Sequence, residues 1–163
     1  MPGWDGGRHL TTERVPEHPL IRRLGTEDLD RLHAIELAAY PFPWSRQILL
    51  DCLRVGYACF GLQLGNSLVG YTIFNWAAGE AHLLNLCIHP HWQHRGYGSL
   101  LLEYTIDHVS KLENEVIFLE VRISNPGAKS LYEHKGFRVV GRRPAYYRAG
   151  EEREDAVVMR MEL

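Results

Sequence analysis

The feature that most constrains the fold of this 163-residue chain is a loop with two glycines between a strand-like segment and a helix-like one. Residues 80–89 predict a strand, and residues 96–112 predict a helix because their apolar residues recur on one face. Backbone N–H groups at a helix start lack partners and carry partial positive charge, so they readily bind phosphate oxygens. Gly96 and Gly98 lack a Cβ and let a pyrophosphate approach the backbone, and Arg95 can add a cationic contact.

The loop also has a plain interpretation, in which the glycines merely start a helix, because one short glycine pattern is weak evidence. Its spacing differs from the G-x-G-x-x-G of dinucleotide sites and from the G-x-x-x-x-G-K-[ST] of nucleotide-triphosphate loops. His89, His91 and His94 stand in the same loop, but Pro90 and Trp92 interrupt them and no acidic residue lies among them. Metal-binding histidines usually sit on rigid elements near a carboxylate or cysteine, so we expect no metal site.

The order of the remaining segments predicts one domain. Residues 1–19 hold glycines and prolines with few apolar residues and are expected to form a loose extension, which leaves a domain at 20–163. Expected strands cover residues 20–24, 57–64, 68–77, 80–89, 116–121, 137–141 and 156–161. Expected helices are capped by Thr26 and Ser45 or cover residues 96–112 and 127–134. This order predicts an α/β (α+β) fold, with a single mixed, mostly antiparallel twisted sheet of about seven strands and helices on both faces.

Composition limits the classes of partner. The formal net charge of −2 argues against a nucleic-acid binder, since such proteins usually carry a basic excess. Three cysteines without a C-x-x-C pair argue against a disulfide framework. The N-terminus lacks the apolar core of a signal peptide, and no apolar run is long enough to cross a bilayer. We therefore expect a cytoplasmic protein with neither a nucleic-acid nor a membrane partner.

A carboxylate stands in the apolar segment 116–121, which predicts a central strand covered on both faces. Glu120 is costly there unless it is solvated or paired, and it lies toward the C-terminal end, where open α/β sheets place ligands. These features mark Glu120 as a candidate general base, although a frayed strand end with Glu120 paired to Arg122 or to solvent fits equally well. On the next helix, Tyr132 is either a core aromatic or a hydroxyl that can donate a proton.

Several motifs together resemble the GCN5-related N-acetyltransferase (GNAT) superfamily. The letters Q-H-R-G-Y-G at 93–98 match its [Q/R]-x-x-G-x-[G/A] signature in the strand-to-helix context that the signature requires. The resemblance narrows to the RimI type, the ribosomal-protein alanine N-acetyltransferases, through motifs that cover most of the chain from about residue 20. These are F-P-W-S at 42–45, F-L-E-V-R at 118–122, S-N at 124–125, L-Y-E-x-x-G-F at 131–137, the tyrosine pair at 146–147 and R-E-D-A at 153–156.

The resemblance implies the GNAT fold, acetyl-CoA as co-substrate and roles for individual residues. Glu120 corresponds to the catalytic base, Tyr132 to the general acid and Asn125 to a residue that contacts the cofactor. The implied contacts to the pantetheine arm and the thioester come from Leu86, Cys87 and Ile88. The implied pyrophosphate loop consists of Gln93, His94, Arg95, Gly96, Tyr97, Gly98 and Ser99, and the implied peptide side consists of Phe42, Trp44, Tyr146 and Tyr147.

The implied reaction is direct attack of an amine on the acetyl-CoA thioester. Glu120 takes the proton directly or through a water, a backbone N–H near Ile88 stabilises the oxyanion, and Tyr132 donates to the leaving thiolate. The expected substrate is a protein N-terminus that begins with alanine, such as that of a ribosomal protein. Two rivals stay open: an enzyme of the same fold that acts on lysine or a small amine, and a catalytically silent acyl-CoA-binding module. The N-terminal extension and Pro126-Gly127 depart from the family pattern, which leaves substrate detail and the start of the next helix open.

Overall fold

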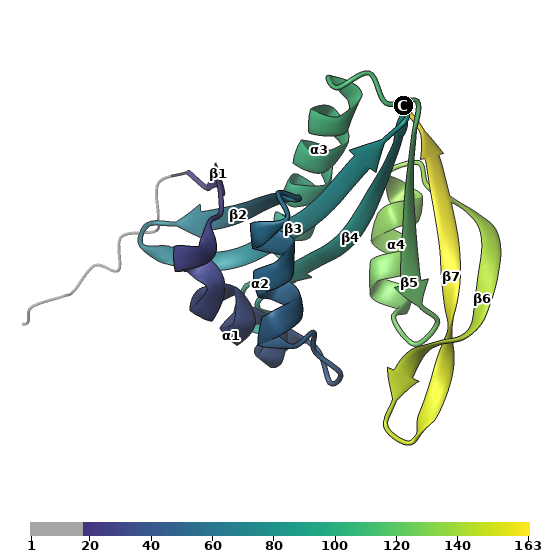
Figure 1. The fold of residues 1–163 in the computed structure, drawn as a ribbon, viewed down its shortest axis with the longest axis horizontal. Helices are drawn as coiled ribbons and strands as arrows, with labels where there is room; N and C mark the ends of the chain where they lie inside the picture. The colour runs from purple at the N-terminus through teal and green to yellow at the C-terminus, as the bar shows by residue number, and fades with distance from the viewer. Residues whose placement is uncertain (1–17) are drawn as a thin grey trace, which may run out of the picture.

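The computed structural model of the chain describes residues 18–163, which form one seven-stranded sheet with helices on both faces (Figure 1). The expected extension lies, except for its last two residues, outside the described residues. The strands are β1 (Leu20–Arg23), β2 (Ala58–Leu64), β3 (Ser67–Ala77), β4 (Glu80–Ile88), β5 (Val116–Arg122), β6 (Arg138–Ala149) and β7 (Glu152–Glu162). The helices are α1 (Leu29–Ala39), α2 (Arg46–Arg54), α3 (Tyr97–Ser110) and α4 (Pro126–His134), with 3-10 turns at Thr26–Asp28 and Pro90–Trp92.

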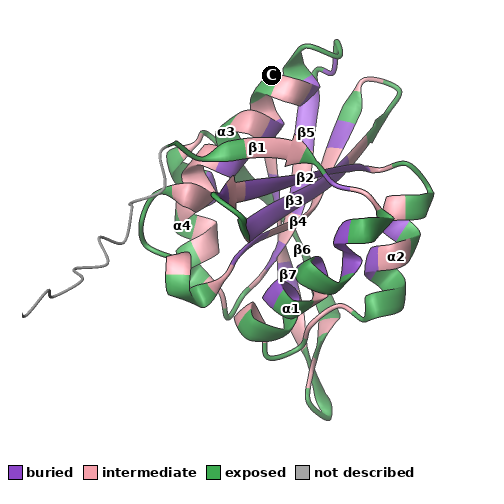
Figure 2. Cartoon of the chain, turned by 90° about the vertical axis from the view of Figure 1, so that its left-hand side faces the viewer, coloured by how far each residue is buried: buried purple, intermediate pink, exposed green. Residues whose placement is uncertain are grey.

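The sheet runs in the order β1-β2-β3-β4-β5-β7-β6, and each neighbouring pair is antiparallel except β4 and β5. The predicted fold class is therefore confirmed. Helices α1 and α2 pack on one face around Tyr71 and Ile73, and α3 and α4 pack on the other around Phe74 and Leu119. Figure 2 shows the buried central strands between these two helical layers. None of the helices in the described residues is long and apolar enough to span a membrane.

Several local predictions are confirmed. Gly65 and Asn66 form the two-residue loop between β2 and β3, whose last pair is Leu64 with Ser67. The Ser45 hydroxyl caps α2 by accepting the Ile48 N–H at 3.2 Å. Helix α4 is followed by a glycine, Gly136, at φ +104°, a backbone conformation that residues with a Cβ rarely adopt.

Three predictions near the first and third helices are wrong. Thr26 lies inside a 3-10 turn and does not cap a helix. Asp28 occupies the N-cap position of α1 without a side-chain cap, and its carboxylate instead accepts the Gly25 N–H at 3.0 Å. The apolar spacing predicts Leu37 or Ala38 on the buried face of α1, but both are exposed and Glu36 is buried instead. Helix α3 ends at Ser110 rather than at Leu112, whose side chain is exposed.

The last hairpin is much longer than predicted. The expected strands of residues 137–141 and 156–161 extend to Arg138–Ala149 and Glu152–Glu162. Nearly all of β6 is exposed, so its sequence lacks the apolar alternation by which a half-buried strand is recognised. Cross-strand pairing with β7, as far as Ala149 with Glu152, holds this segment instead. The hairpin carries Tyr146 and Tyr147.

The expectation that β5 is covered on both faces is wrong for one of them. Ile117, Leu119 and Val121 are buried against the layer of α3 and α4. Phe118 and Glu120, on the other face, are only half-buried, because α1 and α2 pack over β2, β3 and β4 and not over β5. The sheet is thus left open on this face.

Candidate active site

The site arises where the single parallel pair of strands separates. Strands β4 and β5 pair from Glu80 with Val116 to Leu83 with Leu119, and no pairing follows. Figure 1 shows the two strands meeting near the C-terminus of the chain and diverging toward their own C-terminal ends. A bulge at Leu84, where β4 shifts register against β3, stands at the start of this divergence. The divergence leaves the β5 side of β4 without a strand partner from Leu84 onward.

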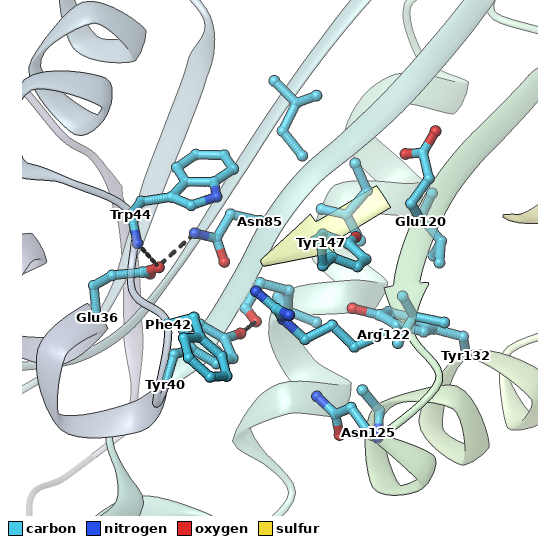
Figure 3. Close-up of a pocket in the computed structure, with 16 residues that line it drawn as sticks. Glu36, Tyr40, Phe42, Trp44, Asn85, Glu120, Arg122, Asn125, Tyr132 and Tyr147 are labelled. Atoms are coloured by element: carbon cyan, nitrogen blue, oxygen red, sulfur yellow. Dashed lines mark hydrogen bonds between the residues drawn. The ribbon is translucent and has the colours of Figure 1, made fainter. Parts of the chain in front are cut away.

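A cavity of about 120 Å³ occupies this divergence (Figure 3). Four parts of the chain line it: the α1 end with the loop that follows, the second half of β4, the end of β5 with the start of α4, and β6. Of the predicted site residues, those that line it are Phe42, Trp44, Leu86, Glu120, Asn125, Tyr132 and Tyr147. The structure therefore brings together residues from four separate sequence segments.

Glu120 lies on the β5 side of the cavity. Its side chain is 17% exposed, and its Oε1 lies 3.4 Å from the Nε of Arg143 on β6. The sequence alternative, a pair with Arg122, does not occur, because Arg122 donates to Glu154 at 2.7 Å and to the Arg148 carbonyl at 2.7 Å. Glu120 thus combines a half-buried position with access to the cavity, as a general base requires.

Tyr132 extends from α4 into the same cavity and packs edge-on against Phe137. The ring belongs to the core formed by α3, α4 and the sheet, so the core-aromatic interpretation holds for most of the side chain. Burial, with a smaller contribution from Tyr147, raises the pKa of Tyr132 well above its usual range. The hydroxyl therefore keeps its proton at neutral pH and can donate it to a strongly basic group.

The glycine loop presents a helix start without a side-chain cap. Gly96 is the N-cap of α3 and adopts φ +86°, which explains the glycine by backbone conformation rather than by the missing Cβ alone. The Gln93 side chain donates to the Ile88 carbonyl at 2.9 Å and ties the loop to the end of β4. Arg95 stacks over Trp92, with its guanidinium carbon 5.1 Å from the ring centre. The uncapped N–H groups of the first turn, at Tyr97, Gly98 and Ser99, suit an anion.

The end of β4 is held by a hydrogen bond to its backbone and by a buried side chain. The Tyr40 hydroxyl donates to the Leu86 carbonyl at 2.8 Å. The Cys87 thiol is buried on the α1 side, and this burial raises its pKa well above the usual value. A thiol that stays protonated is a poor nucleophile, and Cys87 is not among the residues that line the cavity.

Asn125 caps α4, since its Oδ1 accepts the Ala128 N–H at 3.1 Å. Its side-chain nitrogen is therefore left for the cavity that it lines. The helix begins at Pro126, so the departure at Pro126-Gly127 does not delay its start.

Two aromatic residues that the resemblance assigns to the peptide side, Phe42 and Tyr147, enclose a guanidinium. The Arg122 guanidinium carbon lies 5.3 Å from the ring centre of Phe42 and 4.4 Å from that of Tyr147. Tyr146 packs edge-on against Tyr147 at 4.8 Å but does not line the cavity and is largely exposed. The two tyrosines are thus not equivalent.

Sequence reasoning missed four polar residues that line the cavity: Glu36, Tyr40, Asn85 and Arg122. Glu36 accepts hydrogen bonds from the Trp44 N–H at 2.8 Å, the Asn85 amide at 3.0 Å and the Tyr71 hydroxyl. A glutamate on the buried stripe of a helix and an asparagine within an apolar strand were the available signals, because buried polar groups require partners. In residues 18–163 no three histidine, cysteine or acidic side chains are grouped as metal ligands would be.

Comparison with known proteins agrees with this geometry. The model of the acetyltransferase (GNAT) family matches residues 27–137. The chain is 35% identical over 143 residues, 88% of its length and 97% of the relative, to the [ribosomal protein bS18]-alanine N-acetyltransferase of Escherichia coli (strain K12). The enzyme of that name from Haemophilus influenzae is 36% identical over 141 residues, which cover 86% of this chain and 96% of the relative.

Solved structures show the same similarity. The ribosomal-protein-S18-alanine N-acetyltransferase from Escherichia coli superimposes with a TM-score of 0.83 at 34% identity, covering 89% of this chain and 94% of that one. Arabidopsis thaliana NAA60 in complex with acetyl-CoA shares the fold, with a TM-score of 0.79 at 16% identity over 90% of this chain and 99% of that one. The chain belongs to the acetyltransferase (GNAT) family and is an N-acetyltransferase. Acetyl-CoA is the co-substrate that this family uses.

Proposed function

We propose that this enzyme acetylates the α-amine of a protein N-terminus that begins with alanine, that of a ribosomal protein in the cytoplasm. The observation that carries the proposal is that Glu120 and Tyr132 line one cavity, where β4 and β5 separate. The identity to bS18-alanine N-acetyltransferases over most of both chains supports the same substrate class.

The proposed chemistry is a direct transfer without a covalent enzyme intermediate. Glu120 removes a proton from the amine, the amine nitrogen bonds to the acetyl carbon, and the C–S bond then breaks. Tyr132, which its raised pKa keeps protonated at neutral pH, is assigned to give its proton to the leaving thiolate. The acetyl-CoA pyrophosphate is assigned to the loop from Gln93 to Ser99, and Leu86, Cys87 and Ile88 are assigned to the pantetheine arm and thioester.

The acidity of the amine favours an N-terminus over lysine. An α-amine has a pKa about 2.5 units below that of lysine, so that its deprotonation is easier by about 3.5 kcal/mol. A small first residue also suits the cavity, which Phe42, Trp44 and Tyr147 line on the peptide side. The rivals are acetylation of lysine or of a small amine, and binding of acyl-CoA without turnover.

To test the proposal, the enzyme is incubated with acetyl-CoA and, separately, with each of two versions of one peptide. One version begins with free alanine and contains an internal lysine, and the other has a blocked N-terminus. Mass spectrometry should find acetylation at the terminus of the first peptide and none on the second. Equal labelling of lysine in the blocked peptide would favour the lysine-acting rival, and acetyl-CoA binding without turnover of any amine would favour the silent module.

A further inference from the structure

Asn85 is a polar residue in the middle of the apolar segment Leu83–Ile88 of β4, and it lines the cavity. It follows the bulge at Leu84, where β4 shifts its pairing from Phe74 with Leu83 to Ile73 with Asn85. A bulge places two successive side chains on the same side of a strand. Asn85 thereby faces α1 and the cavity instead of the α3 layer, which Leu83 contacts.

The orientation of the Asn85 amide is determined by two acceptors. Its Nδ2 donates to Glu36 Oε2 at 3.0 Å and to the Tyr71 hydroxyl oxygen at 3.2 Å. The Tyr71 hydroxyl donates its own proton to Glu36, so its oxygen can only accept a hydrogen bond from Asn85. A carboxylate also only accepts, so the reverse orientation would set the amide oxygen against two acceptors.

The amide oxygen is consequently directed away from Glu36. Figure 3 shows the Asn85 nitrogen turned toward Glu36 and the oxygen turned into the space between the two sides of the cavity. Within residues 18–163, no hydrogen bond to this oxygen is formed. Glu36 itself is 1% exposed and is satisfied by neutral donors, with no ion pair to any described side chain. The hydrogen bonds of the network are therefore complete around the buried Glu36, and on the cavity side the Asn85 oxygen is left as an acceptor.

We propose that Asn85 Oδ1 binds the reacting amine of the substrate and that Glu36 and Tyr71 position it for this purpose. The inference deepens the proposed function, on which it rests. An amine that attacks a carbonyl needs its lone pair directed at the carbon, and acceptors for its N–H groups fix that direction. Glu120 on β5 and Asn85 on β4 supply acceptors from opposite sides of the cavity. Asn85 exchanges no proton in the reaction and only orients the nitrogen.

The experiment compares a peptide that begins with alanine with its deamino analogue, in which hydrogen replaces the terminal amine. Calorimetry on the complex with CoA, which cannot react, gives both dissociation constants. The wild-type enzyme should prefer the amine peptide. Asn85→Ala should raise the dissociation constant of the amine peptide about tenfold, since one hydrogen bond to the amine is lost. The dissociation constant of the deamino peptide should stay nearly unchanged.

Asn75→Ala is the matched control, because Asn75 lies on the adjacent strand β3 outside this cavity. It should change neither constant. Asn85→Ser, with a shorter side chain, replaces Asn85→Ala if thermal melting shows that the alanine variant does not fold. Equal affinity of the wild-type enzyme for both peptides, or an equal loss for both on substitution, would overturn the proposal.

The proposed function can fail separately. If the wild-type enzyme acetylates a lysine side chain or a polyamine instead of a terminus, the same comparison is made with that amine and its deamino analogue. A selective loss with the new pair would keep the role of Asn85 while removing the N-terminal assignment. If no amine binds or is acetylated at all, both proposals fall.

Discussion

The two sides of the cavity are held together by different forces. On the β4 side, Glu36, Tyr71 and Asn85 are joined by hydrogen bonds, and the first two are fully buried. On the β5–β6 side the contacts are ion pairs, Arg122 with Glu154 and Arg143 with Glu120, and Arg143 is 55% exposed. Buried, satisfied networks rigidify a structure, whereas exposed ion pairs contribute little. We therefore expect the β4 side to hold the reacting groups in place and the β6 side to adapt to the peptide.

The largest effect should come from the base, on the β5 side. Glu120→Gln keeps the shape but cannot accept a proton, so turnover should fall about 10²–10⁴-fold. Binding of acetyl-CoA should stay nearly intact, and the rate should recover at high pH, where hydroxide deprotonates the amine. Steady-state kinetics across pH, with calorimetry for acetyl-CoA, provide the check. An unchanged rate at neutral pH would remove Glu120 as the base.

The next effect concerns the glycine loop at the end of β4. A ligand present at 100 times its dissociation constant stabilises the fold by about 2.7 kcal/mol, so acetyl-CoA should raise the melting temperature. Gly96→Glu should abolish this rise, because it places a side chain and a negative charge at the pyrophosphate loop. Gly65→Glu is the control, since Gly65 also has positive φ and open space around it but lies in the β2–β3 hairpin. If the Gly96→Glu enzyme bound acetyl-CoA with unchanged affinity, the loop would be excluded as the pyrophosphate-binding site.

The third prediction tests the framework behind the β4 side. Hydrogen bonds from Arg22, with further contributions from Gly25 and Arg31, lower the pKa of buried Asp28 to about 2. A lowered pKa stabilises the fold above the ordinary pKa near 4, and this contribution is lost as the pH falls toward 2. Asp28→Asn should thus reduce the free energy of unfolding by about 2 kcal/mol at pH 7 and have little effect near pH 2.

Urea unfolding at several pH values measures this difference. Asp30→Asn is the control, because Asp30 is exposed in its pair with Arg46 and should contribute less than about 1 kcal/mol. A pH-independent loss for Asp28→Asn would assign its effect to packing instead of charge.

The smallest effect is expected on the adaptable side. Tyr147→Ala removes a ring that lines the cavity and contacts Arg122, so the KM for the peptide should rise about tenfold while that for acetyl-CoA changes little. Tyr146→Ala should have a weaker effect, because Tyr146 lies outside the cavity. Initial-rate kinetics with each substrate varied separately test the pair. Equal effects of the two substitutions would contradict the distinction between these tyrosines.

Much of the site followed from local sequence signals. Three features each interrupt a regular sequence pattern: the glycine loop, the carboxylate in an apolar strand and the tyrosine on the next helix. Two of these residues, Glu120 and Tyr132, line the same cavity. The roles assigned to these residues remain predictions. Glu36 and Asn85 were missed because a single buried polar residue shows no partner in the sequence, and their partners lie 35 and 49 positions away along the chain.

The sequence by itself determined the order of strands and helices, the hairpin at Gly65-Asn66 and the caps at Ser45 and Gly136, because each depends on a short stretch of backbone. Only the tertiary structure decided where β4 and β5 separate, which face of β5 stays open and how far the β6–β7 hairpin extends. These features depend on pairing and packing between distant segments. The cavity arises from them, since a sheet opens only where no neighbouring strand or helix covers it.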